Sequence, residues 1–201
     1  MSWIKEIPYE EAEGSLKKLY NRVKGPDNNI DNILMAHSLR PHTLQGHMSL
    51  YKNVLHHRNN QLPKWYLETL GVYVSLLNQC DYCVDHHFAG LQRLVGEEEA
   101  QRLRIGLELD NIPKDLLSPD YVMGLVYARH LTQLSTPMQE NQLESLRTTG
   151  LDDGQILEIN QVVSYFNYAN RTVIGLGVTT KGDILGLSPN DNNDEGNWQH
   201  K

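Results

Sequence analysis

The stretch from Pro63 to Leu77, PKWYLETLGVYVSLL, is the feature that most limits the folds open to this chain. Proline is favoured at the first position of a helix, so Pro63 predicts that a helix begins here. The apolar residues that follow cover almost every side of that helix instead of forming one stripe. A helix of this kind has to be enclosed by other elements, and we expect it to be buried on all sides.

The rest of the chain also has helical periodicity, and strand-type alternation is nearly missing. Leu16, Leu19, Tyr20 and Val23 share one face of a first helix that ends before Gly25. Further helices are expected over NILMAHSL, from Pro41 to Leu55, over the cysteines to Val95, from Gly96 to about Leu107, from Ser118, from Thr136 to Gly150, and from Asp153. Asn78 is the expected N-cap of the cysteine helix, and Thr136 with Gln139 the expected capping box. The predicted fold class is all-α, with about eight helices.

A length of 201 residues suits a single domain. We expect a helical domain over residues 1–180, with its core at about 30–180, and a polar C-terminal tail over 181–201 that is frayed after Leu187. The segments YVSLLNQC and VVSYFNYA resemble each other, which fits either an ancient duplicated helical unit or chance.

The charge pattern argues against several classes of partner. The net charge is -7 and the pI is about 5.7, with no long basic cluster, so we expect no nucleic-acid partner. The first residues, MSWIKEIPYEEAEG, are acidic where a signal peptide is basic, and no segment approaches the ~20 apolar residues of a membrane span. We therefore expect a cytoplasmic protein with no membrane partner, in which a purely structural disulfide is disfavoured.

The two cysteines stand in the segment NQCDYCVDHHF, and a C-x-x-C pair alone fits a metal site, a crosslink or a redox centre. Cys80, Cys83 and His87 fall on one stripe of a helix, and the cysteine spacing permits a disulfide, whose Cα atoms are ~4.4–6.8 Å apart. A helix start stabilises thiolates, and His87 can take their proton. His86 points roughly 100° away, so we place it at the surface or behind the site.

Glu68 is the one carboxylate in the apolar helix, where it could hold or pass a proton. In one continuous helix it would point about 120° away from the cysteine stripe, so it can join the site only if the helix breaks near Asn78. A zinc site using Cys80, Cys83, His87 and a distant histidine or Glu68 is a minority interpretation. The other histidines, at positions 37, 42, 47, 56 and 57, have no ligand-like spacing, and we expect neither a metal nor a cofactor.

Taken together, the pattern Glu68-x11-Cys80-x2-Cys83-x3-His87 resembles the signature of the alkylhydroperoxidase D and carboxymuconolactone decarboxylase superfamily, most closely its peroxidase-related branch. The segments RPHTLQGHMSLYKNVL, LPKWYLETLGVYVSLLNQCDYCVDHH and YFNYANRTVIGLGV are similar to that branch as well. The resemblance covers most of the chain from about residue 30 to 180.

The resemblance implies an all-helical fold in a homo-oligomer, a trimer or hexamer, that reduces hydroperoxides with an external dithiol from a lipoylated or thioredoxin-like protein. By position, Cys83 would be the attacking thiolate, His87 its base, Cys80 the partner that closes the disulfide, and Glu68 the proton relay. Tyr82 stands where alkylhydroperoxidase D has a histidine, which leaves the full proton relay and the reductant open. A decarboxylase-like non-redox enzyme and a Cys/His metal-binding module are the alternatives.

Overall fold

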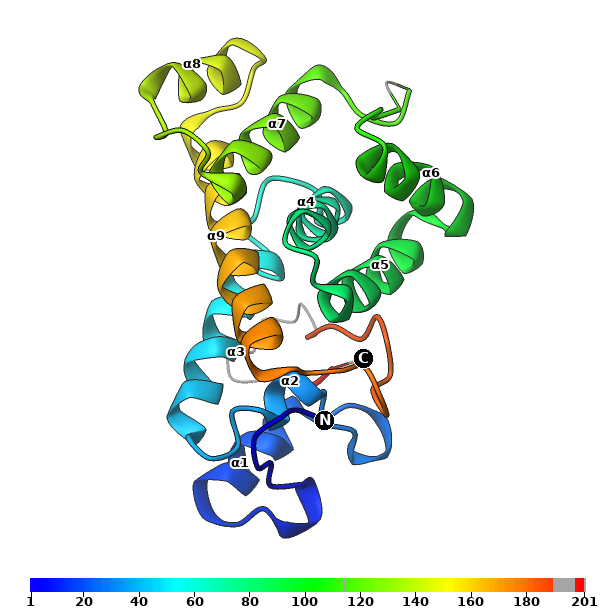
Figure 1. The fold of residues 1–201 in the computed structure, drawn as a ribbon, viewed down its shortest axis with the longest axis vertical. Coiled ribbons are helices and arrows are strands. Elements are labelled where there is room, and N and C mark those ends of the chain that lie inside the picture. Colours follow the sequence, from blue (N-terminus) through cyan, green and yellow to red (C-terminus); the bar gives the residue numbers. More distant parts are fainter. Residues whose placement is uncertain (114, 190–197, 201) are drawn as a thin grey trace.

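The computed structural model describes residues 1–113, 115–189 and 198–200. Over these residues the chain is all-helical, as predicted, with nine α-helices against the roughly eight expected (Figure 1). The helices are α1 (Gly14–Val23), α2 (Asn32–Met35), α3 (Pro41–Leu55), α4 (Lys64–Leu77), α5 (Asp81–Val95), α6 (Glu97–Glu108), α7 (Pro119–Gln133), α8 (Glu140–Thr148) and α9 (Asp153–Leu176), with 3-10 turns at Tyr9–Glu11 and Pro26–Asn28. No helix in this part of the chain is long and apolar enough to cross a membrane.

Helix α4 is the central element of the core. Every residue from Tyr66 to Ser75 is buried. Figure 1 looks almost along α4 and shows α5, α6, α7 and α9 arranged around it, and α3 also contacts it. The prediction of a helix buried on all sides is confirmed.

Helices α4 and α9 approach each other closely at Gly71. A Cβ atom on Gly71 would lie 2.1 Å from Cζ of Phe166 in α9. Phe166 is itself fully buried. The absence of a side chain at Gly71 therefore sets the distance between these two helices.

The chain reverses between α4 and α5. Asn78 is the C-cap of α4 and not the N-cap of the next helix, so that prediction is wrong. Gln79 adopts a left-handed conformation with φ of 56°, its N–H bonds to the Leu76 carbonyl at 3.1 Å, and the Cys80 N–H bonds to the Ser75 carbonyl at 2.9 Å. This Schellman arrangement satisfies the last carbonyls of α4, and Cys80 becomes the N-cap of α5.

The N-cap of helix α8 lies three residues later than the sequence pattern predicts. The first residue of the helix is Glu140, and its capping box pairs Gln139 with Gln142, so the predicted start at Thr136 is wrong. The preceding helix ends at Gln133, and its C-cap Leu134 takes a left-handed conformation with φ of 45°. Residues 135–139 form the connection between α7 and α8. Of the two overlapping polar pairs, Thr136 with Gln139 and Gln139 with Gln142, the second therefore caps the helix.

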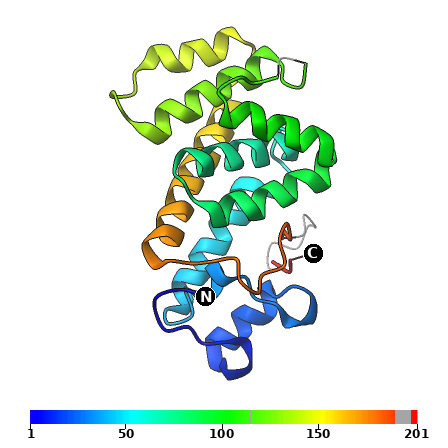
Figure 2. The ribbon, with the colours of Figure 1, turned by 45° about the vertical axis from the view of Figure 1, so that its right-hand side comes forward.

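The segment after α9 packs against the helical body. The prediction of a frayed tail is wrong for residues 188–189 and 198–200, while 190–197 lie outside the described residues. The exposed fraction is 5% for Trp198 and 6% for His200, the His200 Nδ1 atom bonds to the Val23 carbonyl at 2.8 Å, and the Arg22 guanidinium lies 3.8 Å from the Trp198 ring centre. Figure 2 shows this segment returning across the lower part of the molecule beneath α5. An aromatic ring in a polar stretch is enough to anchor it.

The close approach at Gly71 predicts the effect of adding one methyl group. Gly71→Ala should lower the stability by about 1–3 kcal/mol, because the new Cβ overlaps the Phe166 ring. Gly46→Ala, in the exposed middle of α3 with no atom near the new Cβ, should instead raise it by about 0.5–1 kcal/mol. Thermal unfolding followed by circular dichroism measures both, and equal melting temperatures for the two variants would contradict the packing argument.

Candidate active site

The two cysteines lie together at the start of α5. Cys80 is its N-cap and Cys83 follows in its first turn. Both are free thiols, buried to 1% and 3% exposure, and their Sγ atoms are 3.0 Å apart. The pair is therefore placed to exchange a proton or to close a disulfide with little backbone motion.

The first proton lost from this pair leaves the charge mainly on Cys80. The hydrogen bond between the two sulfurs is the largest cause: it lowers the pKa of Cys80 and raises the pKa of Cys83 well above its ordinary value. Burial opposes ionisation of both thiols and so raises both pKa values. The position of Cys80 at the positive end of the α5 dipole favours the same order.

Glu68 and His87 form a buried pair beside the thiols. Glu68 reaches from α4 and His87 from α5, and Oε2 of Glu68 lies 2.7 Å from Nδ1 of His87. The Glu68 side chain is 4% exposed and the His87 side chain 14%. A carboxylate at Nδ1 favours the neutral tautomer in which Nε2 carries the lone pair and can act as a base.

A small cavity connects one of the thiols with this pair. Its volume is about 120 Å³, and Cys83, Glu68 and His87 all line it. The rings of Tyr51 and Tyr165, stacked with centroids 5.4 Å apart, form part of its wall. Burial raises the pKa of both tyrosines well above the ordinary value, so their hydroxyl groups remain neutral hydrogen-bond donors. The cavity wall thus combines tyrosine rings with the Cys83 thiol, the Glu68–His87 pair and further ionisable side chains, which include Asp31, Lys64 and Arg93.

Cys80 borders a different hollow on the other side of the pair. This hollow has a volume of about 310 Å³, and its lining includes Trp3, Asp85 and Val178. Tyr82 lines both hollows. The two sulfurs of one dithiol therefore face two different spaces.

A second polar cluster holds Tyr82 in place, and the sequence interpretation missed it. The Tyr82 hydroxyl donates to Oδ2 of Asp183 at 2.8 Å and accepts from the Ile33 N–H at 3.1 Å. His86 Nε2 lies 3.0 Å from the same Asp183 oxygen, and Asp183 also accepts from the N–H of Asn32. His86 is buried and lines the cavity, so of its two expected placements, at the surface or behind the site, the first is wrong. Asp183 lies 97 residues away in the predicted tail, and no local pattern links the two.

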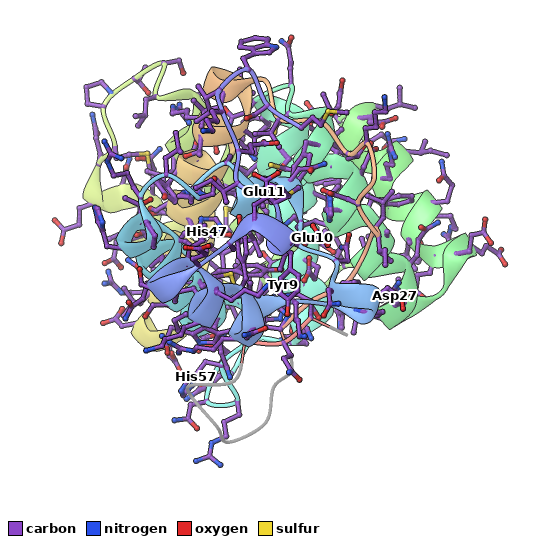
Figure 3. All side chains as sticks on the ribbon, turned by 90° about the horizontal axis from the view of Figure 1, so that it is seen from below. Tyr9, Glu10, Glu11, Asp27, His47 and His57 are labelled. Carbon is purple, nitrogen blue, oxygen red and sulfur yellow. The ribbon has the colours of Figure 1, made fainter. Side chains whose placement is uncertain are left out.

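The other histidines do not form a metal site in the described residues. His47 and His56 are buried and pack around Tyr51, with centroid distances of 6.4 and 4.7 Å. Figure 3 labels His47 within the projected body and His57 near its edge. Among the residues that the structure describes, no three His, Cys, Asp or Glu side chains are placed to hold one metal ion. The zinc interpretation therefore finds no ligand set there, because the thiols bond to each other and His87 bonds to Glu68.

Comparisons with known proteins identify the fold. No protein-family model matches this sequence, and no curated protein does. An uncharacterized peroxidase-related protein from a Silicibacter species is 24% identical, with a TM-score of 0.64 over 77% of this chain and 78% of its own. An uncharacterized peroxidase-related protein from Ralstonia eutropha, described as an alkylhydroperoxidase D core, is 19% identical, with a TM-score of 0.73 over 90% of this chain and 93% of its own. A debrominase in complex with 2,3,4-tribromopyrrole is 11% identical, with a TM-score of 0.64 over 90% of this chain and 91% of its own.

These similarities define the class of architecture. The chain has the alkylhydroperoxidase D-like fold, as the resemblance of its sequence indicates. Proteins with this fold include peroxidase-related proteins and a debrominase, so the fold alone does not specify the reaction. The chemistry has to be argued from the dithiol, the Glu68–His87 pair and the cavity.

The buried histidines predict that stability falls in mild acid. Burial lowers the pKa of His47 from 6.5 to about 3, and it also lowers the pKa values of His37 and His56. Between pH 6.5 and about 3 the unfolded chain binds a proton at His47 that the folded chain excludes, so stability falls as the pH falls. Above pH 6.5 neither state binds this proton, so the stability linked to His47 is fully present there. At pH 5 the loss from His47 alone should be about 2 kcal/mol.

Melting temperatures between pH 7.5 and 5 measure this effect. The melting temperature of His47→Gln should fall less steeply with decreasing pH than that of the unsubstituted protein. Glutamine does not bind a proton in the unfolded chain, so this source of acid destabilisation is lost. His57→Gln, at a half-buried position, is the matched control and should keep the original decline. Parallel declines for all three proteins would contradict the assignment to His47.

Proposed function

We propose that this chain is a thiol-dependent hydroperoxide reductase in the peroxidase-related branch of the alkylhydroperoxidase D and carboxymuconolactone decarboxylase superfamily. One observation carries the proposal: of two free thiols 3.0 Å apart, one lines a small cavity together with a bonded histidine–glutamate pair. Peroxide reduction by a dithiol needs an attacking thiolate, a proton carrier and a second thiol in one place. Cys83, His87 and Cys80 supply these three groups.

The chemistry proceeds in two steps. His87 takes the proton of Cys83, the sulfur attacks the peroxide, and an S–O bond forms as the O–O bond breaks. The leaving alkoxide receives the proton from His87 and departs as the alcohol, and Cys83 is left as a sulfenic acid. The Cys80 sulfur then attacks the Cys83 sulfur, and hydroxide leaves with the Cys80 proton as water. The dithiol loses two electrons and the peroxide gains them.

Access and acidity favour different cysteines as the attacking group. The lower pKa belongs to Cys80, whereas Cys83 is the one that lines the cavity with His87. Because the sulfurs are 3.0 Å apart, a proton can move between them, and a minor fraction of Cys83 thiolate is replenished as it reacts. Access therefore decides, and we assign attack to Cys83. The more acidic Cys80 suits the second step, because its thiolate is ready to displace hydroxide.

An external dithiol must reduce the disulfide again. Cys80 borders the wider hollow, so we assign the approach of the reductant, a lipoylated or thioredoxin-like protein, to that side. A reducing cytoplasm would keep both thiols free between turnovers. Assembly into a homo-oligomer, a trimer or hexamer, is part of the same proposal.

A non-redox reaction is the competing function, and the debrominase with this fold shows that its chemistry varies. In a decarboxylase-like enzyme, Glu68 and His87 would transfer protons and the cysteines would be dispensable. The Cys80→Ser, Cys83→Ser double variant separates the two functions, because a non-redox activity would survive it. The sulfur–sulfur distance favours the redox function, since proton transfer does not need two thiols in contact.

Stoichiometric oxidation tests the dithiol directly. The reduced protein should lose both free thiols with one equivalent of cumene hydroperoxide or the smaller tert-butyl hydroperoxide, counted with a chromogenic disulfide reagent. Cys80→Ser should lose its single thiol and become labelled by dimedone, because the sulfenic acid at Cys83 has no partner. Cys83→Ser should keep its thiol. Two thiols that persist in the unsubstituted protein would refute the peroxidase proposal.

Replacing Glu68 tests the proton carrier. Glu68→Gln keeps the shape but removes the charge that orients His87, so the rate of thiol oxidation should fall about tenfold or more. The pH dependence of that rate should change as well, which a loss of packing alone would not produce. Glu99→Gln, on the exposed face of α6, is the control and should match the unsubstituted protein. Stopped-flow measurement of thiol loss gives the rates, and unchanged kinetics in Glu68→Gln would remove Glu68 from the mechanism.

A further inference from the structure

Asn170 is a fully buried amide on α9 whose role the sequence interpretation did not assign. Its Oδ1 accepts from Nδ2 of Asn78 at 2.9 Å, and its Nδ2 donates to the Ser75 hydroxyl at 3.1 Å. Asn78 and Ser75 both belong to the end of α4, immediately before the cysteines. The two bonds fix which end of the amide is oxygen and which is nitrogen, and they leave one of the two N–H groups of Asn170 for another acceptor.

The amide of Asn170 lies close to the dithiol. Val173, one turn further along α9, packs against Cys80 and Cys83, and Ala169, the residue before Asn170, lines the cavity with Cys83. Asn170 lies between these two residues on α9, and its Nδ2 bonds to Ser75, whose carbonyl accepts from the Cys80 N–H. After the larger effect of the sulfur–sulfur bond, the Asn170 side chain lowers the pKa of each thiol.

A buried thiolate needs a donor, since burial alone favours the neutral thiol. A neutral amide suits a dithiol better than a fixed cation would, because the negative charge moves between two sulfurs during the proposed cycle. An N–H that can reach either sulfur stabilises the thiolate wherever it forms.

We propose that Asn170 is the hydrogen-bond donor that stabilises the thiolate of this dithiol, held in orientation by Asn78 and Ser75. In the proposed reductase, Asn170 would act through the thiolate that it stabilises. Stabilisation of the thiolate itself does not depend on the reductase function.

The pairing of Asn78 with α9 also gives the resemblance between YVSLLNQC and VVSYFNYA a physical counterpart, since Asn78 and Asn167, at equivalent positions, bond to each other at 3.1 Å.

Alkylation of the reduced protein by iodoacetamide, measured from pH 5 to 10, tests the proposal without any peroxide. Asn170→Leu has a similar volume and no donor, so the midpoint of the rate profile should rise by about one pH unit and the rate at pH 7 should fall about tenfold. Asn167→Ala is the matched control, because it removes the other bond to Asn78 but touches neither sulfur. Its midpoint should stay unchanged. A folded Asn170→Leu protein with the original midpoint would overturn the proposal.

Circular dichroism establishes whether Asn170→Leu folds. If it does not, Asn78→Ala answers the question, because it leaves Asn170 in place but frees its oxygen, and Asn78 is only half-buried. The midpoint should then move in the same direction by a smaller amount, relative to Asn167→Ala, and the absence of any shift would overturn the proposal. Oxidation by tert-butyl hydroperoxide separates the two proposals: a shifted midpoint in a protein that peroxide does not oxidise refutes the reductase function and supports the thiolate donor.

Discussion

The reversal of the chain between α4 and α5 is the constraint on which the site depends. If α4 continued as one helix through Cys80, Glu68 would point about 120° away from the stripe of Cys80, Cys83 and His87. The left-handed Gln79 and the two closing hydrogen bonds turn the chain back, so that α5 packs along α4 and His87 meets Glu68. A left-handed conformation in a residue with a side chain costs about 1–2 kcal/mol. Burial of α4 on all sides offsets that cost and makes the reversal permanent.

The sequence was sufficient where the physical cause is local. The proline at the start of α4, the apolar residues around it and the i, i+3, i+7 spacing of the reactive side chains act within a few residues, and the helices and the stripe follow from them. It was insufficient where two local solutions compete or the partner is distant. Asn78 can cap either of two helices, and only the turn at Gln79 decides. The Asp183–His86 contact spans 97 residues, and the sequence marks neither end of it.

The protonation states of the rings that line the cavity could not be predicted from composition. Burial keeps the hydroxyl groups of Tyr51 and Tyr165 protonated and the imidazole of His47 neutral. These rings therefore contribute shape and uncharged polar groups to a wall that also includes Lys64 and Arg93. In the proposed reaction, cleavage of an O–O bond develops negative charge on the leaving oxygen, which neutral donors and a nearby proton carrier would stabilise.

Tyr82 links the redox centre to the C-terminal segment. It lies between the two cysteines in sequence, and it lines both the cavity beside Cys83 and the hollow beside Cys80. The Tyr82 hydroxyl is hydrogen-bonded to Asp183 and to the Ile33 N–H. It is therefore not free to act as a proton carrier in place of the histidine that alkylhydroperoxidase D has at this position. In the proposed function, the peroxide and its reductant would approach the two sulfurs through these different spaces. Because Asp183 holds Tyr82 in place, the shape of both spaces depends on the packing of the segment after α9, which lies more than 90 residues away in the sequence.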